Sequence, residues 1–171
     1  PEGVMSLGQV KREWKASAGV ERYRRGMYTF FYRATPHPAL AVFDAPDSFS
    51  TCTRRIRSNT PLQALTLLND AAFFEFAQNL AARVLKDGPA VDSARLDYAF
   101  RICLARPPSA EEKQRLKTLL EQQIADLAAT PDEGRALAAK NSTAPTEAMQ
   151  RAAWTTVARV LLNLDETITR E

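Results

Sequence analysis

Apolar residues recur at three- and four-residue steps after Ser109. These steps connect Leu116, Leu119, Leu120, Ile124 and Leu127, while charged residues mostly occupy the positions between them. Such spacing is typical of the buried face of an amphipathic helix. Ser109 and Glu112 have the spacing of a capping box, in which each side chain binds the other residue's backbone amide. The pattern predicts a helix over about 110–128.

Two more capping signals place a proline at the first helical position, where its missing amide costs nothing. Thr60-Pro61-Leu62-Gln63 predicts a helix start, and Leu62, Leu65 and Leu68 then follow along one face. Thr130-Pro131-Asp132-Glu133 predicts a short helix over about 131–140. A final helix is predicted from the apolar stripe of Met149, Ala153, Val157, Val160, Leu161 and Leu164, and Asn163 is expected to end it.

The middle of the chain contains a nearly continuous apolar run that Asn69 and Asp70 interrupt. Both residue types prefer caps to helix interiors, which predicts a break here and a new helix over about 71–87. Gly88-Pro89 should stop that helix. Asp92 is then expected to cap a helix through Leu104, which Arg106-Pro107-Pro108 ends. Its inward-facing residues are predicted to be Ala99, Phe100, Cys103 and Leu104.

The segment before residue 60 has weaker helical patterning. Only about 20–34 has helical spacing, through Val20, Tyr23, Met27, Phe30 and Phe31. Prolines break residues 35–59, which are predicted to form a long ordered loop. No segment alternates apolar and polar residues as a strand does. We therefore expect an all-α fold: an irregular helical bundle of about six or seven helices forming a single domain over 1–171, with 1–19 as an extended lead-in.

Composition supports a globular protein. The 171 residues are 45% hydrophobic and 25% charged, and a chain of this length can bury a sufficient core without disulfides or metals. No uninterrupted apolar stretch is long enough to span a membrane. The two cysteines, Cys52 and Cys103, allow either one disulfide or two separate thiols.

Charge is distributed unevenly along the chain. Residues 1–60 contain ten Lys/Arg and five Asp/Glu, a net charge of +5, whereas the remaining residues contain 13 Lys/Arg and 15 Asp/Glu, a net charge of −2. Residues 1–60, the basic third of the chain, could bind nucleic acid, an anionic polysaccharide or an acidic partner. The alternative, which we favour, is that its arginines are solvated or paired within the fold.

Catalytic chemistry has few candidate residues. One histidine, His37, and two distant cysteines fall short of a hydrolytic triad or a zinc site, and the scattered glycines form no phosphate-binding loop. We therefore predict no metal site. Asp44 and Asp47 could form a carboxylate pair for glycoside chemistry or a calcium site. Asp-Ala-Pro-Asp is also a good turn whose side chains accept backbone amides, and we favour the turn.

Three arginines, Arg54, Arg55 and Arg57, follow this turn. Their planar guanidinium groups could bind sulfate, carboxylate or phosphate. Alternatively, one or two of them pair with Asp44 or Asp47 and clamp the loop, which is our preferred interpretation.

Tyr28 and Tyr32 lie one helical turn apart beside His37. They could form a surface for sugar stacking or proton relay, although such aromatics are more often core residues whose polar tips find partners. Cys52 could be a nucleophile of lowered pKa near the arginines, but no base is assigned to it.

Polar residues also border the apolar runs at Asn69 and Asp70, and again at Asn163, Asp165 and Glu166. We expect a structural role for them, in which they hydrogen-bond exposed helix ends.

Three long motifs resemble a known family. They are YRRGMYTFFYRATPHPALAVFDAPD at 23–47, CTRRIRSNTPLQALTLLND at 52–70 and VARVLLNLDETITRE at 157–171. These motifs resemble the C-terminal domain of unknown function in large planctomycete-type proteins that often carry a cytochrome c-like domain.

The resemblance implies that the chain is the C-terminal part of a longer exported protein. That protein would lie in the periplasm, the cell envelope or outside the cell, near polysaccharide breakdown. The family's activity is not established, so no catalytic residue carries over. Haem c would be bound elsewhere, because this chain has no Cys-x-x-Cys-His and is expected to hold no cofactor. Cys52 stands at the family's usual cysteine but Cys103 does not, which disfavours a disulfide between them.

The preferred function is thus a non-catalytic helical domain that docks onto upstream domains of the same polypeptide. In one alternative, Asp44, Asp47, His37 and the arginines contribute to a site for anionic or sulfated polysaccharide. In another, the basic third binds nucleic acid; the implied export and the lack of a base-reading motif count against this alternative.

Overall fold

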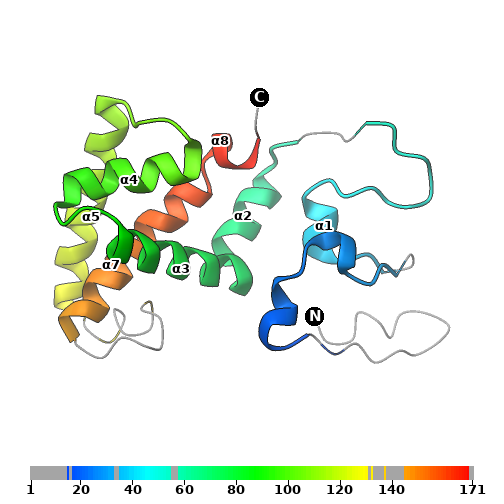
Figure 1. Cartoon of the computed structure of the whole chain (residues 1–171), viewed down its shortest axis with the longest axis horizontal. Coiled ribbons are helices and arrows are strands. Elements are labelled where there is room, and N and C mark those ends of the chain that lie inside the picture. The colour runs from blue at the N-terminus through cyan, green and yellow to red at the C-terminus, as the bar shows by residue number, and fades with distance from the viewer. Residues whose placement is uncertain are drawn as a thin grey trace. The chain divides into compact units, whose positions relative to one another are not determined.

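A computed structural model describes residues 15, 17–32, 35–54, 58–130, 132, 137 and 145–169. The chain separates into two compact units, Pro1–Ser58 and Asn59–Glu171, each of which is described by itself. Within the described residues there are seven α-helices and no strand (Figure 1). The all-α prediction is confirmed, while the single domain stays a prediction.

The second unit contains six described helices. They are α2 (Pro61–Asn69), α3 (Ala71–Asp87), α4 (Asp92–Leu104), α5 (Ala110–Ala129), α7 (Pro145–Leu162) and α8 (Asp165–Ile168). Helix α7 makes its most extensive contacts with α3 and α5, so it forms the centre of the bundle (Figure 1). None of the helices in the described ranges is long and apolar enough to cross a bilayer.

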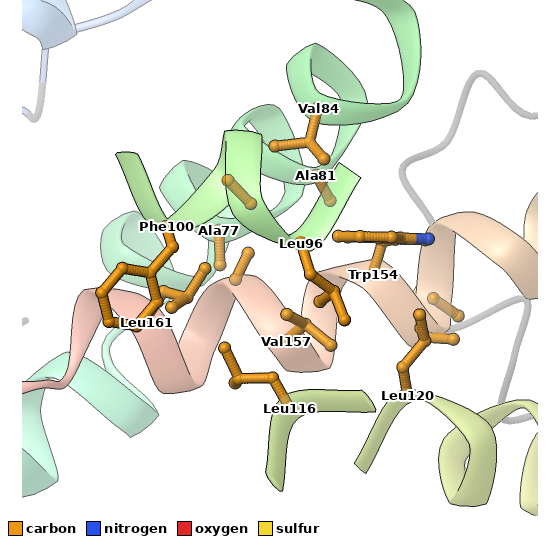
Figure 2. Packing of buried hydrophobic residues seen from close by; sticks show 14 of the residues in the cluster. Ala77, Ala81, Val84, Leu96, Phe100, Leu116, Leu120, Trp154, Val157 and Leu161 are labelled. Carbon is orange, nitrogen blue, oxygen red and sulfur yellow. The ribbon is translucent and has the colours of Figure 1, made fainter. Parts of the chain in front are cut away.

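The core of this unit is built around α7. Figure 2 shows Leu96 and Phe100 of α4 approaching Trp154, Val157 and Leu161 of α7, while α5 packs from the other side. Alanines allow α3 and α7 to approach closely; the fully buried ones are Ala77, Ala81, Ala152 and Ala153. Burial of each large apolar side chain contributes about 1.5–3 kcal/mol. This packing positions the helices that carry the polar side chains of the second unit.

The capping residues predicted from sequence form their hydrogen bonds. The Thr60 Oγ1 accepts from the Gln63 amide at 3.3 Å, and the Gln63 Oε1 accepts from the Thr60 amide at 3.0 Å. Ser109 and Glu112 do the same at 3.2 and 2.6 Å. These boxes satisfy amides that a helix start leaves unpaired, and α2 and α5 therefore begin at the predicted positions.

The helix break at Asn69 and Asp70 is also confirmed. Asp70 ends α2 with an extended backbone and caps α3, because its Oδ1 accepts from the Ala72 amide at 2.8 Å. Asn69 donates from Nδ2 to the Leu65 carbonyl at 2.8 Å, so it binds the end of its own helix. Asn163 lies in the turn after α7 and ends that helix as predicted.

Two details differ from the predictions in this unit. Asp92 is the first residue of α4 rather than its cap, and its carboxylate binds Arg95 instead of a backbone amide. The face expected to be apolar on α2 is largely exposed, since Leu62 and Leu65 keep more than half of their surface while Gln63 is buried. The spacing of these leucines matches the helix that forms, but their exposure shows that this face of α2 is not a core face in the described part of the unit.

The first unit departs most from expectation. The helix predicted over about 20–34 is wrong: two 3-10 turns, Gly19–Tyr23 and Gly26–Tyr28, are separated by extended backbone. Glycine weakens helices, and Gly19 takes a φ of +58° that other residues rarely adopt. Val20 and Met27 are 81% and 68% exposed, so no buried face supports a helix here.

The predicted loop over 35–59 contains one short helix, α1 (Pro38–Val42), and is otherwise irregular in its described part. The lead-in over 1–19 lies mostly outside the described residues. The same holds for the helix predicted over 131–140, of which only Asp132 and Leu137 are described, both in helical conformation.

Candidate functional site

The irregular loop of the first unit is closed by Asp44. One oxygen of its carboxylate accepts two hydrogen bonds from Ser58, from the backbone amide at 3.0 Å and from Oγ at 2.7 Å. Asp44 has a φ of +57°, a left-handed conformation that aspartate tolerates better than most residues. The carboxylate thus joins two loop positions that are 14 residues apart.

Asp47 acts within a tighter turn. Its Oδ1 accepts from the Phe49 amide at 3.0 Å, which is the hydrogen bond of an Asx turn around Ser48. Both aspartates therefore accept backbone amides, as the turn interpretation requires. No group of acids, histidines or cysteines within the described ranges has the arrangement of a metal site. The geometry supports loop ordering rather than a pair of catalytic carboxylates.

The arginines that follow are only partly described. Arg54 is exposed, and its carbonyl lies 3.4 Å from the thiol of Cys52, which donates to it. Arg55 and Arg57 lie outside the described residues. The clamp between these arginines and the two aspartates therefore stays a prediction.

Tyr28 and His37 occupy exposed positions in this unit. His37 precedes α1 and makes no side-chain cap to it. Tyr28 is 64% exposed and therefore is no core residue, although Tyr32 is half-buried. The guanidinium carbon of Arg24 lies 5.9 Å from the centre of the Tyr28 ring.

Tyr28 belongs to a segment that contains three aromatic residues and three arginines, residues 19–30, here called the aromatic–arginine segment. Its exposed large side chains are Val20, Tyr23, Met27, Tyr28 and Phe30. Arg22 lies 5.7 Å from the centre of the Tyr23 ring, and Arg24 binds Glu21 through two hydrogen bonds of 2.8 and 2.7 Å. That pairing lowers the pKa of Glu21 below its ordinary value. The segment therefore presents exposed aromatic rings with arginines against two of them, and Glu21 holds one of these arginines, Arg24, in place.

A second polar cluster lies in the helical unit around Arg106. Its guanidinium group donates to Glu112 at 3.0 and 2.8 Å and to Glu166 at 2.8 and 2.5 Å. It also lies 4.9 Å from the centre of the Phe100 ring. One arginine after α4 thus connects the start of α5 to α8.

The ion pairs in this cluster perturb its carboxyl groups. Hydrogen bonds from Arg106, and then from Ser109, lower the pKa of Glu112 to about 2. Arg106 likewise lowers the pKa of Glu166. Both carboxylates therefore remain charged in the fold at pH values where free glutamate is protonated.

The sequence pattern did not predict this cluster. Arg106 was expected only to end a helix, and Glu166 was expected to bind a helix end rather than a side chain. Asp165 accepts a hydrogen bond from the Asn59 side chain, which joins the residue before the α2 cap to α8. These contacts span 60 and 106 residues, and no local spacing signals them.

The two cysteines are free thiols. Cys52 is exposed, whereas Cys103 is half-buried in α4 and packs against the core. Burial raises the pKa of the Cys103 thiol to about 11. The structure thus has the separate thiols that were one of the two expected arrangements.

Part of the chain matches the model of a known family. Residues 2–120 match the model of the family PSD1, described as a protein of unknown function (DUF1553). The matched region includes the first two motifs quoted above but not the third, 157–171. Neither the curated proteins nor the solved structures contain a significant match to the chain. Because the matched residues are well over half of its length, the chain belongs to the DUF1553 family.

Proposed function

We propose that this chain is a non-catalytic docking domain of a larger exported protein of the planctomycete type, in which haem c is bound by another domain. The observation that carries the proposal is the aromatic–arginine segment. Its large side chains are 56–81% exposed, and two of its tyrosines carry adjacent arginines. Tyrosine and arginine are enriched among the residues that dominate protein interfaces.

The partner that we infer is an acidic and partly apolar surface on upstream domains of the same polypeptide. Residues 1–60 carry a net charge of +5, which favours association with an acidic surface. The aromatic rings would supply the buried area of the interface, and the arginines would supply its charge complementarity. The resemblance of the three motifs to domains of cytochrome c-associated proteins supports the exported, haem-associated setting.

The neighbouring loop favours docking over catalysis. Asp44 and Asp47, the two acids considered for glycoside chemistry, accept hydrogen bonds from Ser58 and Phe49. Both carboxylates are thus used to hold the conformation of their own loop. An ordered loop of this kind is consistent with a binding surface, and docking assigns no catalytic role to either acid.

Met27 provides a direct test of docking. It is 68% exposed in this chain, and exposed methionines react readily with hydrogen peroxide to give the sulfoxide. We expect Met27 to be oxidised in the 171-residue chain and protected in the full-length protein. Met149, which packs against the core, serves as the internal reference in both samples.

A matched pair of variants completes this test. Tyr23→Ser combined with Tyr28→Ser should restore Met27 oxidation in the full-length protein, because both changes remove aromatic contacts from the proposed interface. The control is Val91→Ser, which removes an apolar side chain from the helical unit. Val91 is 68% exposed, as Met27 is, and its replacement should leave Met27 protected. Equal oxidation of Met27 in the short and full-length chains would rule out docking through this segment.

A further inference from the structure

A pocket of about 600 Å³ lies in the helical unit where the end of α3 meets α4 and α7. Its charged lining consists of Arg83, Lys86, Asp87, Arg95, Glu147 and Arg151. The lining thus holds four cations and two carboxylates, and with Asp92, which pairs with Arg95 from outside the lining, the net charge is +1. The volume is within the range of pockets that hold small organic ligands and exceeds what a simple ion fills.

Arg95 is the buried member of this lining. Only 8% of the residue is exposed, and its Nη1 donates to Asp92 at 2.8 Å. The guanidinium carbon also lies 5.8 Å from the centre of the Trp154 ring. Its Nε has no hydrogen-bond partner in the described part of the chain. A buried donor without a hydrogen-bond partner calls for an explanation, and a ligand in the pocket that Arg95 lines is the explanation that the charges of the lining favour.

The turn after α3 contributes to the same arrangement. A Cβ at Gly88 would lie 2.4 Å from the Val84 carbonyl oxygen and 3.3 Å from the Cγ of Arg95. Glycine therefore lets the chain pass directly over the Arg95 side chain. Asp92 and Trp154 hold the guanidinium group, and this turn lies against the aliphatic stem of Arg95, so binding through it would cost little side-chain entropy.

The remaining cations are placed toward the exposed rim. Arg83 is 62% exposed in its side chain and lies 3.9 Å from Asp87, a separation at which neither group is fully neutralised. Guanidinium groups bind the oxygens of phosphate and sulfate through planar pairs of hydrogen bonds. The arginines and the lysine of the lining favour an anionic ligand group with several strong acceptor oxygens.

We propose that this pocket binds a small organic molecule bearing a phosphate or sulfate ester, with the ester held by Arg95 and the rim cations. This site lies outside the aromatic–arginine segment and does not depend on the docking role. The ester group would occupy the charged part of the pocket, and the organic part of the molecule would fill the volume that a simple ion leaves empty. A neutral molecule of the same size should not bind.

Trp154 fluorescence reports on this site. The chain has two tryptophans, Trp14 and Trp154, so a Trp14→Phe background leaves one emitter next to Arg95. Titration with glucose 6-phosphate or glucose 6-sulfate should change the emission, and glucose should not. A response to only one of the two esters identifies the group that is recognised. No response to either ester, or an equal response to glucose, overturns the proposal.

Variants at the rim test the assignment without risking the core. Lys86→Gln combined with Arg83→Gln should weaken ester binding about tenfold or more, because each removes a charge-assisted contact. Arg115→Gln, at an arginine on α5 that is 78% exposed and outside the lining, should leave the affinity unchanged. Equal affinity of the rim variant and the Arg115 variant places the ligand elsewhere and contradicts the proposal.

Discussion

Arg159 of α7 donates a 2.7 Å hydrogen bond from Nη2 to the backbone carbonyl of Leu68, 91 residues earlier in the chain. In an uninterrupted helix this carbonyl would accept from the Ala72 amide, but that amide donates to Asp70 instead. Arg159 thus replaces the hydrogen bond that the helix break removes. Its guanidinium carbon also lies 5.6 Å from the centre of the Phe74 ring. The angle between α2 and α3 is therefore fixed by a contact from α7.

Substitution of Arg159 by methionine should destabilise the helical unit by about 1–2 kcal/mol, because the half-buried Leu68 carbonyl loses its charged donor. Urea denaturation followed by circular dichroism measures this change. The matched control is Arg83→Met at an exposed site, which should cost less than 0.5 kcal/mol, roughly the range for surface substitutions.

A double-mutant cycle separates this mechanism from a general loss of packing. Asp70→Ala frees the Ala72 amide, which can then pair with the Leu68 carbonyl as in a continuous helix. The loss from Asp70→Ala with Arg159→Met should consequently be smaller than the sum of the two single losses. If the loss of stability in the double variant equals the sum of the two single losses, Asp70 and Arg159 are not coupled through the Leu68 carbonyl.

The helix boundaries after residue 60 could be predicted because their causes are local. Thr60 and Gln63, like Ser109 and Glu112, are three residues apart, and Asp70 caps the helix that follows it directly. Such signals act through backbone amides within the next few residues. The break and the capping boxes were therefore available from the sequence without knowledge of the packing.

Other features depend on contacts that no local pattern contains. The spacing of Val20, Tyr23 and Met27 is helical, yet the fold gives them no buried face and the predicted helix does not form. Arg106 and Arg159 act across 60 and 91 residues. A sequence identifies them as charged residues near helix ends, but only the packed bundle determines which carboxylate or carbonyl each one meets.

Asp44 should tolerate asparagine better than alanine. Asparagine also adopts positive φ readily and retains an oxygen that can accept from Ser58, whereas alanine loses both hydrogen bonds and is strained at a φ of +57°. We expect the Ser58 amide to exchange with deuterium about tenfold faster or more in Asp44→Ala than in Asp44→Asn, since one or two hydrogen bonds are lost. Similar exchange in both variants would mean that this contact does not hold the loop.

The two thiols should differ in reactivity. The pKa of Cys103 is raised from 9.0 to about 11, so at pH 8 its thiolate fraction is reduced about a hundredfold, and burial limits access further. Iodoacetamide should alkylate the exposed Cys52 in the folded protein and spare Cys103, as measured by peptide mass spectrometry. Both should react in denaturant. Equal labelling of the folded protein would show that α4 opens on the timescale of the reaction.

Acid should weaken the cluster around Arg106 within a defined range of pH. The pKa of Glu112 is about 2 in the fold, against an ordinary value of 4.5, because Arg106 and Ser109 bind its carboxylate. A lowered folded-state pKa means that the stabilisation is fully present above about pH 4.5 and is lost as the pH falls toward 2. The melting temperature should fall over this interval.

Glutamine at position 112 isolates this effect. Glu112→Gln keeps an oxygen for the Ser109 amide but has no charge for Arg106, so it should melt below the parent protein at pH 6. The difference between the two melting temperatures should shrink as the pH falls from 4.5 to 2, because the parent protein then loses the same charge. Glu111→Gln is the matched control, since Glu111 pairs with the exposed Arg115 at the surface of α5 and should give a small, nearly pH-independent difference. Parallel melting curves for the parent and Glu112→Gln would show that the Glu112 charge contributes no stability through Arg106.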